Sequence, residues 1–459
     1  AETETDIRGI RGAYHVKTVL KLKAGEKKEW YFCGEVDQDH RALSELRIFL
    51  ARSGSEIIRK LEEEIAEAGS ELMRIIGRND GLQLSGSEIS CTHHAANVLF
   101  NTMRGGYFVN LSAIRREDLL KYLSLRNRRL PESDMSLFRN LPKTVAWAEL
   151  MEAFAASESR DTVRVIGEFL PLTFSRRHGD PSRPWNRFFI DTANADGSAK
   201  IGYEGNWRDI FQNWEALLRS FPLFIFPVIR RFLNSTSADG YNPYRITATG
   251  VEWETPDEDD PWSNIGYWSD HQIIYLGKLL ELAEDYFPHV LVKMLSKEEG
   301  VYVDIPYRIR PLEQILEDPR NTIDYDEEKD HMLAERKESM GEDGALLHYN
   351  GGGFVYASAA EKILILILAK LVNFVPDGGI WMNTQRPEWN DANNALVGYG
   401  LSMVTLAYLD RFISFLLPIL EKAEEPFPVH LTVLNLFTRI ETILTHRPLK
   451  EEPFSDKER

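Results

Sequence analysis

The feature that most constrains the fold is a long series of apolar segments with helical periodicity, separated by long polar loops. After Ser87, apolar residues recur at a spacing of three to four, which predicts one helix after another with few strand signals between them. The expected helices are Glu88–Met103, Arg116–Leu123, Trp147–Ser157, Thr162–Glu168, Trp207–Leu233, Gly266–Leu295, Ser358–Phe374, Asn394–Leu420 and Val429–Thr445. The main loops, at 175–206, 235–264, 299–330 and 341–353, are rich in Gly, Pro, Asn and Trp, and loops of this length are usually functional. The pattern therefore predicts an all-α fold, a toroid of helical hairpins with a pocket where the loops converge.

Two smaller regions precede the expected toroid, which spans 87–459. Ala13–Leu22 and Glu29–Gly34 have the pattern of two strands joined by a polar hairpin loop. Because an isolated hairpin is at best marginally stable in water, we expect residues 1–40 to be the C-terminal strands of a β-sandwich domain. Residues 41–86 show amphipathic periodicity and are expected to form a helical linker.

Composition narrows the class of partner. The net charge of −17 argues against nucleic acid and against an anionic membrane surface. Ala1–Asp6 lacks the basic and then apolar pattern of a signal peptide, and the apolar runs Phe221–Ile229 and Ile363–Ala369 are shorter than the ~20 residues of a membrane span, so we expect a cytoplasmic protein. Cys33 and Cys91 are expected to be ordinary buried thiols. No histidine or cysteine spacing typical of a metal site occurs, and we expect no metal or other cofactor.

A polar and aromatic cluster opens the helix expected at 207–233. Helical spacing places Arg208 and Gln212 on one face. The other members that we single out are Tyr203, Trp207 and Asp209. Sugars require planar groups that bind hydroxyls in pairs and flat apolar faces that cover the ring, so we predict that these five residues bind substrate. The alternative is an Arg/Asp pair that caps the helix beside core tryptophans.

A second cluster occupies the loops 239–245 and 261–272, and it contains Trp268. Aromatic side chains at this density in polar loops are costly to leave in water. They either line a pocket or pack the loops on each other, and we assign Trp268 to the predicted substrate site. Asp270 and His271 follow, and this pair is more often a helix N-cap than an acid/base pair.

The third cluster is the loop Gln385–Asn394, which lies between two of the most apolar segments. It contains Glu388, Trp389, Asn390 and Asp391, and so combines two carboxylates with an indole and an amide. A polar cluster between two buried helices suggests a sugar-binding acid. The alternative is a solvated loop in which Asn390 or Asp391 caps a helix.

These residues resemble the motifs of the cellobiose and chitobiose phosphorylases, an inverting glycoside phosphorylase family with an (α/α)6 barrel. Residues 208–213, Arg-Asp-Ile-Phe-Gln-Asn, are similar to the family's Arg-Asp-x-x-Gln-Asp motif at the head of a barrel helix. Residues 388–391, Glu-Trp-Asn-Asp, are similar to its Asp-Trp-Asn-Asp motif. The chain departs from the family at Asn213 and Glu388, where the motifs have Asp. The family's domain order is a β-sandwich, a helical linker and a barrel, and most of this chain resembles that order.

The resemblance implies roles for individual residues. Asp391 resembles the general acid that protonates the glycosidic oxygen, Trp389 a wall of the sugar site, and Arg208 with Asp209 a clamp on sugar hydroxyls. We place Glu388 and Asn390 in the same substrate site. The implied activity is cleavage or formation of a β-glycosidic bond in a glucan or oligosaccharide, with inorganic phosphate as co-substrate.

Three points stay open. An inverting hydrolase needs a second carboxylate to activate water, and Glu204 or Glu388 could serve; a phosphorylase needs a phosphate pocket instead. A non-catalytic sugar-binding or scaffolding toroid is the alternative outside enzymes. The family's later barrel helices are not found after Asp391, so we expect another polypeptide or cleaved segments to complete the barrel and the β domain, and a homo-oligomer is a further alternative.

Overall fold

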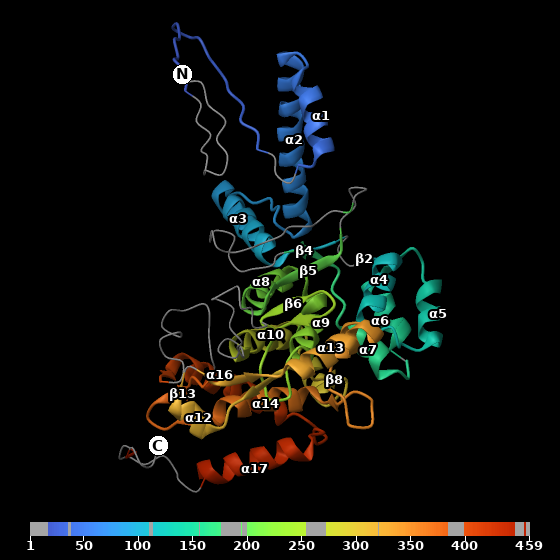
Figure 1. Cartoon of the computed structure of the whole chain (residues 1–459), viewed down its shortest axis with the longest axis vertical. Coiled ribbons are helices and arrows are strands. Elements are labelled where there is room, and N and C mark those ends of the chain that lie inside the picture. The colour runs from blue at the N-terminus through green and yellow to red at the C-terminus, as the bar shows by residue number, and fades with distance from the viewer. Residues whose placement is uncertain are drawn as a thin grey trace. The chain divides into compact units, whose positions relative to one another are not determined.

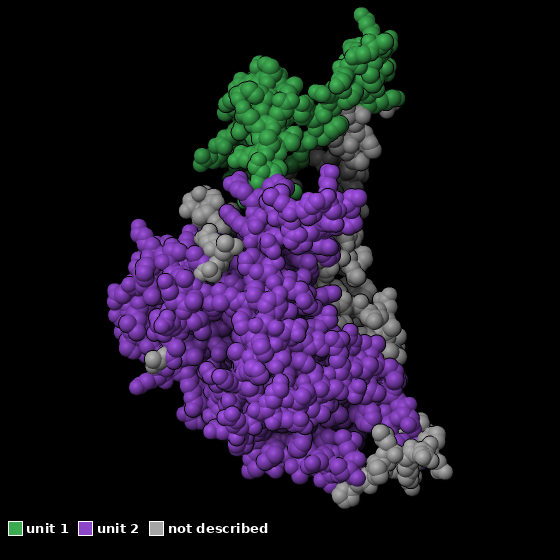
Figure 2. Space-filling view, turned by 180° about the vertical axis from the view of Figure 1, so that it is seen from behind, with its two compact units in different colours: residues 1–72 green, residues 73–459 purple. Residues whose placement is uncertain are grey.

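The computed structural model describes residues 17–34, 38–109, 113–155, 157–175, 194, 200–253, 272–319, 321–383, 399–445 and 454–455. For Arg104, Phe174, Ser175, Asn206, Arg208 and Asp209 only the backbone is described. The chain divides into two compact units, Ala1–Leu72 and Met73–Arg459, which Figure 2 colours separately. Each unit is considered by itself.

The first unit contains the expected hairpin turn but no strand ladder in its described part. The Glu26 N–H donates to the Lys23 carbonyl at 3.0 Å, and Gly25 has a φ of +80°, which glycine adopts readily. The described parts of the strands expected at Ala13–Leu22 and Glu29–Gly34 are extended chain without ladder pairing. The turn chemistry is therefore local, whereas ladder formation requires a partner strand, which no described residue supplies.

Two helices follow where the sequence predicts amphipathic helices. They are α1 (His40–Leu50) and α2 (Gly54–Arg78), and the second continues into the second unit. The Tyr31 hydroxyl donates to the Glu62 carboxylate at 2.8 Å, which ties the extended segment to α2.

The second unit is mostly helical, with small sheets (Figure 1). Its helices are α3 (Glu88–Gly105), α4 (Arg116–Arg126), α5 (Glu132–Asn140), α6 (Trp147–Phe154), α7 (Arg160–Gly167), α8 (Trp207–Ser220), α9 (Ile225–Asn234), α10 (Gln272–Tyr286), α11 (Val290–Leu295), α12 (Leu312–Glu317), α13 (Glu327–Met340), α14 (Ala359–Leu371), α16 (Met403–Leu420) and α17 (Leu431–Thr445). Helix α17 runs beside α14.

A five-stranded sheet that the sequence did not predict joins β1 (Tyr107–Phe108), β4 (Leu172–Ser175), β5 (Gly202–Asn206), β6 (Arg245–Thr247) and β7 (Val251–Glu252), in that order. Only the β4–β5 pair is parallel. A three-stranded sheet joins β12 (Phe374–Val375), β13 (Gly379–Trp381) and β14 (Leu401–Ser402). Two-stranded pairs are formed by β2 (Ala113–Arg115) with β3 (Thr144–Ala146), β8 (Gly300–Val301) with β11 (Tyr356–Ala357), and β9 (Tyr307–Ile309) with β10 (Ile323–Tyr325). These strands are two to five residues long, too short for period-two alternation to stand out in the sequence.

The core is centred on α8 and α9. Trp207 lies 4.7 Å from Phe211 and 4.6 Å from Phe232 between ring centroids, and Trp214 lies edge-on to Phe211 at 5.2 Å. The Trp214 indole N–H donates to the Gly105 carbonyl at 2.8 Å, which fixes α3 against α8. Truncating one buried aromatic ring of this kind to alanine typically costs ~3–5 kcal/mol.

Two of the expected helices are broken. The segment predicted as one helix over 207–233 is α8 and α9, separated by a short 3₁₀ turn that begins at Pro222. Phe221 precedes that proline and has a φ of −129° and a ψ of 63°, because the proline ring disfavours helical geometry in the residue before it. The segment expected at 266–295 contains α10 and α11, which are separated by a residue with positive φ, His289 at +70°.

Several expected loops contain regular structure. Helix α13 begins at Glu327, within the loop expected at 299–330, and Asp326 caps it by accepting the Lys329 N–H at 3.0 Å. Acidic side chains in the first turn of a helix interact favourably with the positive end of the helix dipole. The same charges that indicate a loop in the sequence therefore also stabilise the start of a helix. Helix α5 was missed as well. Cys33 is exposed and Cys91 is half-buried, so the expectation of two buried thiols is wrong for Cys33.

Helix α16 is the one helix in the described ranges that is long and apolar enough to cross a membrane by length and composition, and 28% of it is buried. The sequence-based statement that every apolar run is too short is corrected by this helix. Its middle carries Asp410 and Arg411, which are costly in hydrocarbon. Arg411 forms an ion pair with Glu281 of α10 at 2.6 Å. The charge of Arg411 therefore has a role as a contact between the two helices.

Candidate functional site

Most of the predicted catalytic segment lies outside the described residues. Glu388, Trp389, Asn390, Asp391 and Trp268 belong to this part of the chain. Arg208 and Asp209 are in the first turn of α8, and their side chains are likewise outside the described part. The described members of the predicted site are Tyr203, Trp207 and Gln212.

The described aromatic members are packed into the protein. Trp207 is 3% exposed and its ring contacts the rings of Phe211 and Phe232. Tyr203 is 4% exposed and meets Trp214 edge-on at 5.1 Å. Much of the surface of these two rings is therefore covered by other rings, which is the arrangement that the alternative of core aromatics anticipates. Gln212, by contrast, is exposed on α8.

Helices α8 and α10 run in the same direction. Lys278 pairs with Glu215 at 3.0 Å, and further along both helices the Tyr286 hydroxyl donates to the Arg219 carbonyl at 3.0 Å. Contacts later along α8 are therefore made by residues later along α10, as in a parallel pair of helices. The two helices begin on the same side.

Helix α16 shares this direction. Arg411 pairs with Glu281, and beyond the end of α16 Lys422 pairs with Glu284, one turn later on α10, at 3.4 Å. The first turns of α8, α10 and α16 therefore lie on one side of the unit. Helix α8 begins within the first cluster singled out in the sequence and α10 begins at the last residue of the second, Gln272. Helix α16 begins after the third cluster, 385–394, and directly after β14.

The two ends of the 384–398 segment are held together. The Met382 N–H donates to the Gly400 carbonyl at 3.1 Å, and Trp381 pairs with Leu401 between β13 and β14. The described residues on either side of the segment are therefore neighbours.

That place is connected to the head of α8. Asn383, at the start of the segment, hydrogen-bonds through its side chain to Tyr241. Three residues later, the Tyr244 carbonyl accepts the Trp207 N–H at 3.1 Å. Burial raises the pKa of Tyr241 above its ordinary value, so this hydroxyl stays neutral and available for hydrogen bonding.

Gln272 is a residue that the sequence reasoning missed. It opens α10, is 0% exposed, and neither its amide oxygen nor its amide nitrogen has a hydrogen-bond partner within the described ranges. A buried amide without partners is costly, on the order of 1–3 kcal/mol, and such groups are rare in folded proteins. The Trp207 indole N–H is buried and without an acceptor in the same described part. The available signal was position, because Gln272 ends the second aromatic cluster.

A cavity of about 310 Å³ lies beside β5. Tyr203 and Glu204 line it together with the rings of Tyr122 and Phe169. Charged and polar side chains around it come from Asp118, Lys121, Asn194, Lys200, Thr247 and Thr249. A lining of aromatic side chains together with a few polar groups is the usual composition of a small-molecule site, and the volume is at the lower end for such sites.

A buried charge cluster supports one wall of this cavity. Arg126 donates to the Thr249 carbonyl at 2.6 Å, and Arg231 donates to the Gly250 carbonyl at 2.6 Å. Both guanidinium groups also contact the buried Glu168 carboxylate, at 2.6 Å and 3.3 Å. Burial raises the pKa of Tyr203, so its buried hydroxyl stays neutral beside the Arg231 guanidinium. The cluster fixes the turn between β6 and β7 and thereby the rim of the cavity.

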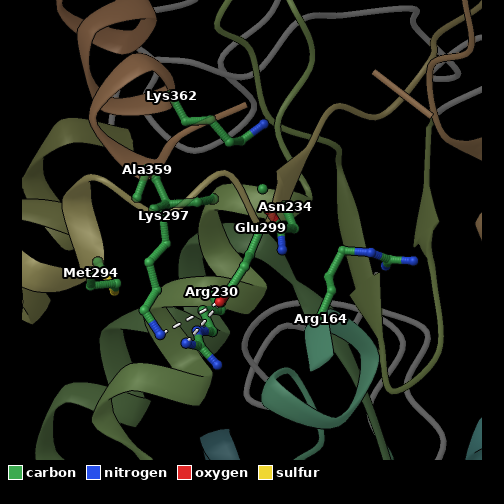
Figure 3. Close-up of a pocket in the computed structure, with 10 residues that line it drawn as sticks. Arg164, Arg230, Asn234, Met294, Lys297, Glu299, Ala359 and Lys362 are labelled. Carbon is green, nitrogen blue, oxygen red and sulfur yellow. Dashed lines mark ion pairs between the residues drawn. The ribbon is translucent and has the colours of Figure 1, made fainter. Parts of the chain in front are cut away.

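A second, much smaller cavity of about 20 Å³ has room for about one water molecule. Figure 3 shows Arg230 and Lys297 converging on Glu299, at 3.1 Å and 3.5 Å. Lys362 lines the cavity from α14, and burial lowers its pKa well below the ordinary value. Its amine donates to the Val301 carbonyl at 2.5 Å. These contacts satisfy one another, so the cavity has the character of a structural void.

No group of three or more metal-ligating side chains occurs among the residues that the structure describes. No protein-family model matches the chain, and no curated protein sequence matches it.

Proposed function

We propose that the chain is a carbohydrate-active enzyme that cleaves or forms a β-glycosidic bond with inversion, with Asp391 as the general acid and inorganic phosphate as the acceptor. In this proposal the helices of the second unit belong to an (α/α)6-type toroid. The substrate site lies at the shared start of α8, α10 and α16. An oligosaccharide or glucan enters there between Trp268, Trp389 and Gln212.

One observation carries the proposal. The hydrogen bonds from Asn383 to Tyr241 and from Trp207 to Tyr244 link the base of the 384–398 segment to the head of α8. They support a short distance between the two motifs on which the proposal rests.

Chain length is consistent with this arrangement. Asp391 is eight residues from Asn383, which allows a reach of roughly 27 Å at full extension. Neighbouring helices pack ~8–10 Å apart, so the heads of three adjacent helices span roughly 20 Å. The carboxyl of Asp391 can therefore be brought over any of the three helix starts without unfolding β13 or β14.

The buried polar groups support a site at the same end. The Gln272 amide and the Trp207 indole N–H have no hydrogen-bond partner within the described residues. Trp207 is the first residue of α8, and Gln272 is the first residue of α10. Both residues are buried, Gln272 at 0% and Trp207 at 3% exposed, so these groups add polarity at the helix starts without contacting a sugar directly.

The experiment compares the chain with its Asp391→Asn variant. β-Linked gluco-oligosaccharides are incubated with and without inorganic phosphate, and the sugar 1-phosphate and reducing ends are measured. We expect phosphate-dependent turnover in the wild type and a loss of at least roughly a hundredfold in Asp391→Asn, the magnitude of general acid catalysis. The matched control is Asp410→Asn, an exposed carboxylate on α16.

The outcomes separate the candidates. Wild-type rates in Asp391→Asn would dismiss the acid assignment. Oligosaccharide binding without turnover favours a non-catalytic sugar-binding protein.

The hydrolase is the second candidate, and the cavity beside β5 favours it because Glu204 lines this cavity. An inverting hydrolase requires a base about 6.5–9.5 Å from the acid. Turnover that is independent of phosphate and is lost in Glu204→Gln would assign Glu204 as that base. Turnover that requires phosphate and survives in Glu204→Gln would leave the phosphorylase reading in place.

A further inference from the structure

A side-chain cluster at the starts of α14 and α17 is independent of the site proposed above. Its centre is Glu361, which is 1% exposed. The Tyr302 hydroxyl donates to Glu361 Oε1 at 2.6 Å, and the His430 backbone N–H donates to Oε2 at 2.6 Å. The Nδ1 atom of His430 lies 2.9 Å from both carboxylate oxygens. Burial raises the pKa of Tyr302, which keeps it a neutral donor to the carboxylate.

The other ring nitrogen of His430 contacts a hydroxyl. Its Nε2 lies 3.0 Å from the hydroxyl of Tyr349, whose side chain is 52% exposed. Because Nδ1 faces the Glu361 carboxylate, it carries the ring proton, and Nε2 is left with the lone pair that accepts the Tyr349 proton. Hydroxyl, imidazole and buried carboxylate thus stand in the order that activates a nucleophile in hydrolases.

The turn that carries Tyr349 leaves room for a substrate. The Tyr349 N–H donates to the Gly353 carbonyl at 3.0 Å, and the Gly352 N–H donates to the Tyr349 carbonyl at 2.9 Å. Gly352 and Gly353 have φ of +88° and +84°, and a Cβ on any of the three glycines 351–353 would have no neighbour within 4 Å. The N–H groups of Gly351 and Gly353 have no acceptor among the described residues, so they are free to donate to a molecule bound at this turn.

We propose that Tyr349, His430 and Glu361 form a triad that activates the Tyr349 hydroxyl as a nucleophile toward small acyl esters. The Tyr349 oxygen attacks the ester carbonyl carbon and its proton passes to His430 Nε2. The bond to the alcohol breaks, and His430 returns the proton to the leaving oxygen. Water then attacks the acyl-tyrosine, which releases the carboxylic acid and restores the Tyr349 hydroxyl.

A purely structural role explains part of this geometry. The Ser358 hydroxyl donates to the Pro428 carbonyl at 2.7 Å, and together with the two bonds from His430 to Glu361 it holds the start of α17 against α14. Such a latch requires Nδ1 alone. It does not require an exposed phenol at Nε2 or an open glycine turn beside it.

The test uses p-nitrophenyl acetate in excess over the full chain. We expect a burst of p-nitrophenolate approaching one equivalent per chain, and acetylation of Tyr349 by mass spectrometry. Tyr349→Phe removes an exposed hydroxyl only, so the fold is retained and the burst is lost. His430→Gln and Glu361→Gln slow acylation, by roughly a hundredfold for loss of the general base.

The matched control is Tyr286→Phe, whose hydroxyl is also accessible but donates to a backbone carbonyl instead of an imidazole. It should retain the wild-type burst. Thermal unfolding of each variant reports the latch separately, and a latch alone would lower the unfolding temperature of His430→Gln without any burst in the wild type. No burst in the wild type, an undiminished burst in Tyr349→Phe, or acetylation only at lysines would each overturn the proposal.

Discussion

The buried charge cluster of Arg126, Arg231 and Glu168 also includes Arg164 and Asp343. Replacing Asp343 by asparagine tests this cluster most directly. Asp343 is 0% exposed and lies in the short helical turn after α13. Its carboxylate accepts from Arg164 Nη2 at 2.5 Å and from Asn127 at 3.0 Å, and it lies 3.2 Å from Arg126 Nε. The substitution to Asn preserves shape and removes charge, so it leaves two buried guanidinium groups with less compensation.

The expected cost is large because Glu168 is then the one fully buried carboxylate left to compensate Arg126, Arg164 and Arg231 among the described residues. Removing one partner of a buried ion pair destabilises by ~3–5 kcal/mol. With an unfolding entropy of about 2.1 cal/mol/K per residue, that corresponds to a fall in unfolding temperature of roughly 4–6 °C for a unit that spans residues 73–459. The assay is urea unfolding followed by tryptophan fluorescence, since Trp207 and Trp214 are buried in the core.

The matched control is Glu281→Gln, which removes the carboxylate of the exposed Arg411 pair between α10 and α16. Exposed pairs contribute only about 0.2–1 kcal/mol. If Asp343→Asn costs no more than Glu281→Gln, the cluster is not the constraint that we describe.

The pH dependence supplies a second measurement. Burial alone would raise the pKa of Asp343, but Arg164 and Arg126 outweigh it and the pKa is lowered. A carboxyl with a lowered folded pKa contributes stability that is fully present above its unfolded pKa of about 3.9, and this stability is lost as pH falls through the folded value. The difference between wild type and Asp343→Asn should therefore be constant at neutral pH and shrink only below about pH 4.

Two further substitutions test the packing of the second unit. Gly341→Ala should destabilise by about 1–3 kcal/mol or more, because Gly341 has a φ of +90° and a Cβ would lie 2.6 Å from the Leu125 carbonyl oxygen. In urea unfolding its stability should be lower than that of Gly352→Ala, which shares a positive φ, +88°, but whose Cβ would meet no neighbour. In Lys362→Met the sign follows from the lowered pKa of Lys362: the unfolded chain binds the proton more tightly, so wild-type stability rises with pH between the folded pKa and about 10.4, and the variant should lose this rise in unfolding curves collected across that range. A slope that is identical in both proteins would contradict the burial of Lys362 as the cause.

Local signals were predicted well. The start of α3 directly after Ser87 follows from residue chemistry alone, since the serine side chain caps the helix. The mostly helical character follows from the apolar spacing. These features depend on neighbours within about four residues, and a sequence displays such neighbours directly.

Features that depend on distant partners could not be predicted. Glu361 contacts Tyr302 and His430, which are 59 and 69 residues away. Nothing in the pattern around His430 distinguishes it from the other histidines. The break of the 207–233 segment at Pro222 was within reach of sequence reasoning, because Phe-Pro is a poor helix interior, but the strong apolar periodicity on both sides outweighed it.

The shared direction of α8, α10 and α16 also shapes the electric field of the second unit. Each helix presents the positive end of its dipole, equivalent to about half an elementary charge, on the side where all three begin. Three such ends side by side oppose the field of a chain whose net charge is −17. In the proposed function, these three dipole ends would favour an incoming phosphate ion without any arginine or lysine having to be committed to it.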